Sequence, residues 1–253
     1  MTRIISHRGY HTHDPSIPEN SIPAFENALK YEADGLELDV HLTKDHHLVV
    51  YHDYDLSKLG STQIIREAAL EEVLAVELMP GITIPSLEEV LDQFAGKCFL
   101  NIEVKSKEPC GQVLVDQLES SGIIHDTECL VVSSFETDRL KELHGLDPAI
   151  PTGLLCHLAR NEVRKAQQLG CVALNPYFDK IPRQHAKRPR WFFQWLVDHY
   201  SGKAITEALG KGLRVNPWTV NSEEYLTKLF EVGVSGVITD EVPRAVKIRS
   251  LIH

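Results

Sequence analysis

Cysteine is scarce in this chain and shows no pattern of pairing. The 253 residues include five cysteines, Cys98, Cys110, Cys129, Cys156 and Cys171. An odd, widely spaced set without a CxxC pair argues against a disulfide framework and against a zinc site. All except Cys110 lie in or beside apolar runs, which favours buried thiols. The sequence therefore predicts reduced cysteines and a cytoplasmic setting.

Long apolar runs and an excess of basic residues are also lacking. No run approaches the length that a membrane-spanning helix needs, and the first residues lack the charged and apolar regions of a signal peptide. Lys and Arg number 26 against 36 Asp and Glu, a formal net charge of -10. This balance argues against a nucleic-acid partner. A small anionic substrate remains compatible, because a bound cation reverses the local field.

The composition is that of a globular protein, with 43% hydrophobic and 25% charged residues. The length fits one large α/β domain, which we expect to span residues 1–253. Eight short runs rich in Val and Ile predict strands, at Arg3–His7, Gly35–Val40, Phe99–Lys105, Leu130–Phe135, Pro151–Cys156, Val172–Phe178, Arg214–Val220 and Gly236–Thr239. Amphipathic segments between them predict helices, including Asn20–Tyr31, Leu87–Phe94, Gly111–Ser120, Glu136–Leu143, Ala159–Leu169 and Ser222–Val232.

Strands that alternate with helices indicate a parallel sheet. Eight such units predict an α/β fold of the closed (β/α)8 type, a TIM barrel. A doubly wound open sheet is the alternative. That alternative is weaker as a nucleotide-binding fold, because no glycine-rich phosphate fingerprint follows the first strand.

Two stretches interrupt the alternation. Residues 43–85 contain an apolar run, Leu48–Tyr51, and a helical pattern over Glu67–Leu78, and we expect them to form a small insertion after strand two. Residues 180–203 contain six Lys or Arg, one acid and five aromatic residues. Loops that follow barrel strands lie on the catalytic face, so this basic aromatic loop is predicted to lie beside the active site.

Acidic residues alternate with apolar residues in the second predicted strand. Glu37 and Asp39 point the same way, because side chains alternate between the two faces of a strand. Two acids facing into a barrel repel each other unless a cation or basic groups neutralise them. The pair is compatible with an oxygen-ligand site for Mg²⁺ or Ca²⁺ and with a pair of salt-bridged carboxylates.

The third predicted strand places Asn101, Glu103 and Lys105 on one face. Glu103 completes a set of three carboxylates for a hard cation. Lys105 offers a positive charge for a phosphate oxygen. The alternative, a buried Glu–Lys network, is costly unless every group is satisfied.

Two histidines converge on these acids. His7 ends the first strand and precedes Arg8, and a hairpin with its turn at Asp45 and His46 would pair Asp39 with His52. This set suits hydrolysis of a phosphodiester, since a cation, Arg8 and Lys105 would offset the charge on the phosphate oxygens. One histidine could accept a proton from the nucleophile and the other could protonate the leaving alkoxide.

Short motifs occur in order along nearly the whole chain. They are His7-Arg8-Gly9, Pro18-Glu19-Asn20-Ser21, Glu37-Leu38-Asp39-Val40, His52-Asp53, Ile84-Pro85-Ser86-Leu87, Asn101-Ile102-Glu103-Val104-Lys105, Ser133-Ser134-Phe135, Trp218-Thr219-Val220-Asn221 and Gly236-Val237-Ile238-Thr239-Asp240. As an ordered set they are specific, and the chain resembles the glycerophosphodiester phosphodiesterase family.

The resemblance implies a TIM barrel with a small insertion after strand two. It implies that a small glycerophosphodiester is hydrolysed to glycerol 3-phosphate and an alcohol. It also implies a role for each candidate residue: His7 and His52 as the acid/base pair, Glu37, Asp39 and Glu103 as ligands of one divalent cation, Mg²⁺ or Ca²⁺, Arg8 and Lys105 as phosphate contacts, and Trp218 in the glycerol pocket.

The chain departs from the family pattern at two loops. The loop between Gly9 and Pro18 carries His11, His13 and Asp14, which we expect to face solvent rather than to act as extra ligands. After His52-Asp53, residues 56–62 replace the family's Arg-Thr-Thr segment, so the sequence leaves open whether that segment contacts the site.

Two other functions are compatible with the sequence. A lysophospholipase D acting on lysolipids at a membrane surface would use the basic aromatic loop for peripheral membrane contact. That loop also suits a lid or a dimer contact, which we favour. A non-enzymatic barrel that binds a phosphorylated ligand is the third alternative. The sequence leaves open the alcohol headgroup, the oligomeric state, and which histidine is acid and which is base.

Overall fold

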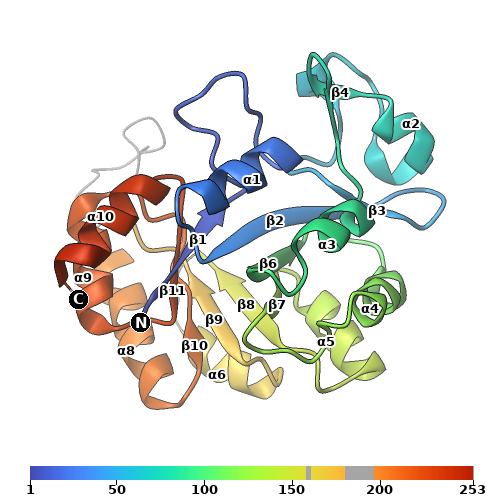
Figure 1. The fold of residues 1–253 in the computed structure, drawn as a ribbon. Helices are drawn as coiled ribbons and strands as arrows, with labels where there is room; N and C mark the ends of the chain where they lie inside the picture. Colours follow the sequence, from blue (N-terminus) through green and yellow to red (C-terminus); the bar gives the residue numbers. More distant parts are fainter. Residues whose placement is uncertain (158–160, 180–196, 253) are drawn as a thin grey trace, which may run out of the picture.

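The computed structural model describes residues 1–157, 161–179 and 197–252. Its centre is a ring of eight parallel strands (Figure 1), in the neighbour order β10-β9-β8-β7-β6-β2-β1-β11. The strands are β1 (Arg3–His7), β2 (Gly35–Leu42), β6 (Phe99–Val104), β7 (Leu130–Ser134), β8 (Thr152–Cys156), β9 (Ala173–Pro176), β10 (Arg214–Val215) and β11 (Gly236–Thr239).

The ring nearly closes between β10 and β11. Ser235 N donates to Val215 O at 3.0 Å, and Val220 N donates to Ile238 O at 2.9 Å. This closure confirms the predicted TIM barrel and contradicts the open, doubly wound alternative.

Helices surround the barrel (Figure 1): α1 (Ile22–Lys30), α3 (Leu87–Phe94), α4 (Gly111–Ser120), α5 (Thr137–Leu146), α6 (Glu162–Gln168), α8 (Gly202–Gly210), α9 (Glu223–Val232) and α10 (Val242–Ile252). Local sequence sets their ends, as in α3, where the Ser86 hydroxyl accepts a hydrogen bond from Glu89 N at 3.1 Å. Leu36, Leu38 and Val40 of β2 are fully buried in the layer between barrel and helices. Each such side chain stabilises the fold by roughly 1.5 to 3 kcal/mol. No described helix combines the length and the apolar character that crossing a membrane requires.

The barrel interior changes from apolar to polar along the strands. An apolar cluster that includes Ile5, Phe99 and Ile238 fills one layer. The buried amides of Asn101 and Asn175 belong to a hydrogen-bonded chain, in which Asn216 Nδ2 donates to Asn175, Asn175 Nδ2 to Asn101, and Asn101 Nδ2 to Ser133 Oγ, at 3.0 to 3.2 Å. The chain satisfies these buried groups and forms a polar layer at the level of Glu37, with which Asn101 is paired in the register of β2 and β6.

The predicted insertion lies between β2 and α3. It contains β3 (Leu48–Val50), two 3-10 turns (Ser57–Leu59 and Ile65–Glu67), α2 (Leu70–Leu74), β4 (Glu77–Met79) and β5 (Ile82–Thr83). It has a separate apolar cluster that includes Tyr51, Leu56 and Ile65. The predicted helix over Glu67–Leu78 is wrong in extent: only α2 is α-helical, and β4 and β5 form a hairpin whose turn holds Gly81 at φ +80°.

The predicted hairpin register is wrong by one residue. β2 and β3 pair Val40 with Val50 and Leu42 with Leu48, and Tyr51 N donates to Asp39 O. Asp39 therefore faces Tyr51, and His52 lies one position beyond. The connecting loop is closed by Thr43 N donating to the oxygen of His47, with His46 at φ +63°.

Two further stretches differ clearly from prediction. The strand predicted over Arg214–Val220 ends at Val215, because Pro217 has no N–H to donate to a ladder. Of the predicted basic aromatic loop, residues 180–196 lie outside the described part of the chain. Residues 197–203 are helical rather than loop, since a π-helical turn at Val197–Ser201 leads into α8.

Candidate active site

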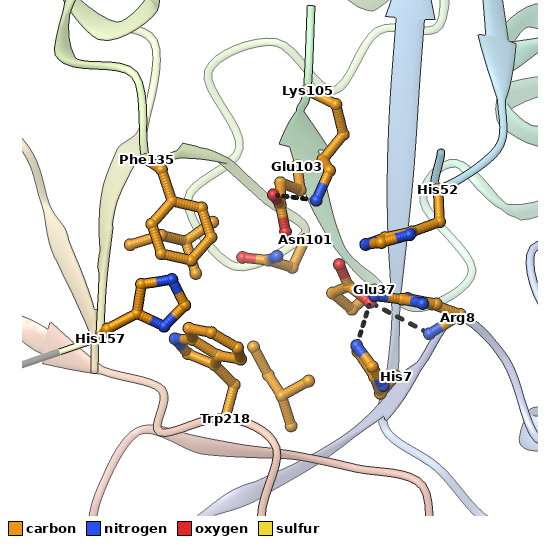
Figure 2. A pocket seen from close by; sticks show the side chains of 12 residues that line it. His7, Arg8, Glu37, His52, Asn101, Glu103, Lys105, Phe135, His157 and Trp218 are labelled. Carbon is orange, nitrogen blue, oxygen red and sulfur yellow. Dashed lines mark hydrogen bonds and ion pairs between the residues drawn. The ribbon is translucent and has the colours of Figure 1, made fainter. Parts of the chain in front are cut away.

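A cavity of about 290 Å³ lies at the carboxyl ends of the barrel strands. Its two sides differ in chemistry (Figure 2): charged and imidazole side chains, including His7, Arg8 and His52, face an apolar and aromatic wall that contains Phe135 and Trp218. Glu37, Glu103 and Lys105 also line it. Seven of the eight predicted site residues therefore reach one cavity, and Asp39, the eighth, is fully buried beside them.

Three carboxylates gather beside this cavity. Each of Glu37, Asp39 and Glu103 offers one oxygen, and these oxygens lie within 4.8 Å of one another. The parallel register pairs Asp39 with Glu103, which brings the two strands' acids to the same level. Asp39 Oδ1 is buried and accepts no hydrogen bond from the described residues. A set of carboxylate oxygens with an unsatisfied member fits a hard divalent cation, and these three residues could hold one.

Two basic residues contact the carboxylates. Arg8 Nε lies 3.1 Å from Asp39 Oδ2, and Lys105 Nζ lies 3.0 Å from Glu103 Oε1 and 3.7 Å from Asp39 Oδ1. Two positive charges against three carboxyl groups leave the site short of positive charge. Burial, together with the charge of Asp39, raises the pKa of Glu37 to about 8. Burial also opposes ionisation of Asp39, but Arg8 and Lys105 outweigh it and lower its pKa.

The backbone after β1 is fixed by the same acids. Arg8 has a φ of +56°, and its N–H donates to both the backbone and side-chain oxygens of Glu37 at 2.9 and 3.0 Å. Gly9 follows at φ +79°, where a Cβ would lie 2.6 Å from Ala24 Cβ. Asn20 Nδ2 donates to Asp39 Oδ2 at 2.9 Å. The sequence His7-Arg8-Gly9 thus forms a turn that no bulkier third residue would permit.

A carboxylate contacts His7 on the Nδ1 side of its ring. Its Nδ1 lies 2.7 Å from Asp240 Oδ1, and its Nε2 lies 4.0 Å from Glu37 Oε2. Asp240 Oδ2 accepts a hydrogen bond from Asn221 Nδ2 at 2.6 Å. Burial lowers the pKa of His7, but the hydrogen bond to Asp240 and the charge of Glu37 outweigh it and raise the pKa.

His52 also contacts an aspartate, but this aspartate is paired with a lysine. Its Nδ1 lies 2.7 Å from Asp53 Oδ1, and Lys58 Nζ lies 2.6 Å from the other oxygen of Asp53. Lys58 lies in the segment 56–62, so this segment does supply a contact to the site. Burial lowers the pKa of His52, and the positive charge of Arg8 adds to this effect.

Trp218 lies on the opposite wall. Its Nε1 donates to Asn175 O at 2.8 Å, so the indole presents a ring surface to the cavity. The ring of His157 stacks on Phe135 with centroids 4.8 Å apart and meets Trp218 at 5.4 Å. Figure 2 shows His157 between these two aromatic side chains.

Sequence patterns assigned no role to three residues that the structure places here. Asp240 and Asn221 occur in the motifs at the ends of their strands, but nothing in the sequence pairs them with His7. His157 directly follows the predicted strand Pro151–Cys156, and a polar residue at a strand's carboxyl end was the available signal. The loop residues His11, His13 and Asp14 do not line this cavity. His13 is exposed near Glu241, and Asp14 accepts hydrogen bonds from Ser16.

Comparison with known proteins connects this arrangement to a family. Residues 7–244 match the model of the glycerophosphoryl diester phosphodiesterase family. A glycerophosphodiester phosphodiesterase of Caldanaerobacter subterraneus is 32% identical over 95% of this chain and 94% of its own. A human protein named lysophospholipase D GDPD1 is 25% identical over 100% of this chain and 87% of its own.

Solved structures share the fold. A glycerophosphodiester phosphodiesterase of Thermotoga maritima superimposes with a TM-score of 0.76 at 28% identity, covering 98% of this chain and 99% of its own. An Oleispira antarctica phosphodiesterase, solved in complex with the product sn-glycerol-3-phosphate, has a TM-score of 0.76 at 23% identity, covering 100% of this chain and 97% of its own.

Proposed function

Because the chain belongs to the glycerophosphoryl diester phosphodiesterase family and is therefore a phosphodiesterase, we propose that it hydrolyses small glycerophosphodiesters to glycerol 3-phosphate and an alcohol. One observation carries this proposal: two histidines, two basic residues and three carboxylates meet at one cavity, on one side of an aromatic wall. The cavity is lined by the charged groups that a phosphodiester requires and by an aromatic wall that an organic arm could contact.

Arg8 and Lys105 bind the phosphate in this account. Both basic groups line the cavity and both contact the buried acids. A substrate phosphate would replace part of these contacts, since each side chain has several donors. Positive charge at fixed positions offsets the charge that develops on the non-bridging oxygens.

Glu37, Asp39 and Glu103 would hold one divalent cation, Mg²⁺ or Ca²⁺. When bound, the cation supplies positive charge to the phosphate oxygens. The three carboxylates are buried and crowded, and Asp39 Oδ1 accepts no hydrogen bond from the described residues, so the donor set suits a hard cation.

His7 and His52 move protons. The aspartate on each Nδ1 orients the ring so that Nε2 is available for the reaction. His7 lies at the end of β1 in the barrel mouth, and we assign it as the base that accepts the proton of the nucleophile. His52 lies after the inserted strand β3, nearer to an exiting group, and we assign it as the acid that protonates the leaving alkoxide.

A lysophospholipase D activity is the second candidate, favoured by the human relative of that name that aligns with the whole of this chain. The two candidates share chemistry and differ in whether the glycerol arm carries an acyl chain. The product complex of the Oleispira relative supports a glycerol phosphate product.

The test is an assay of glycerol 3-phosphate release from glycerophosphocholine and glycerophosphoethanolamine, with Mg²⁺, with Ca²⁺ and with a chelator. We expect release that requires a cation. Release only from lysophosphatidylcholine, as lysophosphatidic acid, would support the second candidate. No release from any of these substrates would contradict both.

A further inference from the structure

His157 is a polar group in an otherwise apolar part of the cavity. It directly follows β8 and lies between Phe135 and Trp218 (Figure 2). Leu155 and Ile238 also line the cavity. His157 lines the cavity and is exposed to solvent, and among the residues that the structure describes its ring nitrogens have no hydrogen-bond partner.

Other polar side chains near this wall already make hydrogen bonds within the protein. Trp218 Nε1 donates to the backbone oxygen of Asn175. The Asn101 amide donates to Ser133 and accepts from Asn175. Among the described residues of the wall, His157 therefore has the hydrogen-bonding capacity that a ligand could use. Burial and the nearby charge of Lys105 lower its pKa, which favours a neutral ring with one donor and one acceptor.

A glycerol arm placed against this wall requires hydrogen-bond partners for its hydroxyl groups. Its hydroxyls leave water, and a hydroxyl buried against apolar rings without a partner is costly. Figure 2 shows Arg8 and Lys105 across the cavity from this wall, so a phosphate held by these two residues would direct one arm toward the aromatic rings. A neutral imidazole among those rings can donate to and accept from one hydroxyl.

We propose that His157 recognises the terminal hydroxyl of the glycerol arm and thereby selects free glycerophosphodiesters over substrates whose glycerol is acylated at that oxygen. This inference rests on the proposed function. An ester at the terminal oxygen removes the hydroxyl proton and adds a chain that the space beside Phe135 and Trp218 must accommodate. An analogue that lacks the hydroxyl loses the hydrogen bond to the imidazole but still occupies the space beside the aromatic rings, so it is disfavoured relative to a substrate that makes the bond.

The experiment compares three substrates that all release choline: glycerophosphocholine, 2-hydroxypropyl phosphocholine, which lacks only the terminal hydroxyl, and 1-acyl lysophosphatidylcholine. The variants are His157→Phe, which keeps an aromatic ring but removes both nitrogens, and His157→Gln, which keeps a donor and an acceptor. We expect the wild type to prefer glycerophosphocholine over the deoxy analogue by about tenfold or more in kcat/KM. The Phe variant should lose this preference and the Gln variant should retain part of it.

The outcomes are distinguishable. An unchanged preference in His157→Phe, or no preference in the wild type, would overturn the inference. A gain in the relative rate on lysophosphatidylcholine in His157→Phe supports it. If the Phe variant melts at a clearly lower temperature, His157→Ala provides the same test. Calorimetry that compares the binding of sn-glycerol 3-phosphate with that of 2-hydroxypropyl phosphate tests the role of His157 without turnover. If the wild type hydrolyses none of the three substrates, that result therefore contradicts the proposed function and not the role of His157.

Discussion

Oδ1 of Asp240 lies 2.7 Å from Nδ1 of His7, although 233 positions separate the two residues. A carboxylate accepts, so Nδ1 carries the proton and Nε2 faces Glu37 and the cavity. Asn221 holds the other oxygen of Asp240. His52 has the same contact to Asp53, but there Lys58 neutralises the aspartate. The aspartate that contacts His52 is thus paired with a lysine, whereas the aspartate that contacts His7 is hydrogen-bonded to a neutral amide.

The difference predicts unequal effects of two matched substitutions. Asp240→Asn should lower kcat by roughly 10²-fold or more with little change in KM, because the ring of His7 loses the charge that fixes its tautomer. Asp53→Asn should lower kcat less, since Lys58 already offsets the charge of Asp53. Steady-state kinetics on glycerophosphocholine measure both, and equal, small losses would contradict the role given to Asp240.

The backbone conformation of Gly9 and its close contact with Ala24 predict an effect of substitution on the free energy of unfolding. Gly9→Ala places a Cβ 2.6 Å from Ala24 Cβ at a φ of +79°. The left-handed backbone alone costs about 1 to 2 kcal/mol, and the close contact should add roughly 1 to 3 kcal/mol.

Gly60→Ala is the matched control, because Gly60 has a φ of +77° and nothing within 4 Å of its Cβ position. Urea unfolding of both variants measures the difference. We also expect Gly9→Ala to lower activity, since His7 and Arg8 precede it directly. Equal destabilisation of the two variants would show that the contact with Ala24 is easily relieved.

Sequence patterns predicted the parts of this structure that depend on local periodicity. The barrel strand Arg3–His7 and the helix Leu87–Phe94 have the predicted bounds, because alternation and capping are encoded in neighbouring residues. The hairpin register was missed by one residue because it depends on the loop closed by Thr43 and His47, with a left-handed His46.

Contacts between distant parts of the chain were less accessible to sequence reasoning. The acids of β2 and β6 were predicted to converge, since both strands carry them at their carboxyl ends in a parallel sheet. The pairing of Asp240 with His7 requires β1 and β11 to be neighbours, which only closure of the barrel provides. His157 acquires its surroundings from Phe135 and Trp218, which come from other strands.

The carboxylate set predicts stabilisation by a divalent cation. Mg²⁺ or Ca²⁺ should raise the melting temperature of the chelated protein, because a ligand at about 100 times its Kd stabilises the folded state by about 2.7 kcal/mol. Glu37→Gln and Glu103→Gln should lose most of this shift. Glu37→Gln should also stabilise the chelated protein, since it removes one of the crowded carboxyl groups.

Glu19→Gln is the control for these variants, because Glu19 contacts Arg8 but is not one of the three clustered acids. It should keep the cation-dependent shift. Scanning fluorimetry over a series of cation concentrations provides the measurement. A full shift in Glu37→Gln and Glu103→Gln would place the cation elsewhere.

The buried thiols predict how stability depends on alkaline pH. Burial raises the pKa of Cys110 and of Cys156 from 9.0 to about 12. Between these two pKa values the unfolded chain releases thiol protons that the folded chain retains. The free energy of unfolding is therefore unaffected by these thiols below pH 9.0 and decreases as the pH rises above it. Each thiol contributes up to about 1.4 kcal/mol per pH unit in that range.

Urea unfolding at a series of alkaline pH values tests this. The double variant Cys110→Ala and Cys156→Ala should show a shallower decline than the wild type, whatever its stability at neutral pH. The same slope in both proteins would mean that the thiols do not contribute.

The most direct test of the account compares glycerol 3-phosphate release from glycerophosphocholine by the wild type, His7→Ala and His52→Ala, each with a divalent cation and with a chelator. We predict cation-dependent release by the wild type and a loss of roughly 10²- to 10⁴-fold in each variant. A substrate with an activated leaving group should restore turnover to His52→Ala but not to His7→Ala, and the opposite rescue would exchange the two roles. Undiminished release by both variants would contradict the central claim that these two histidines carry out the reaction.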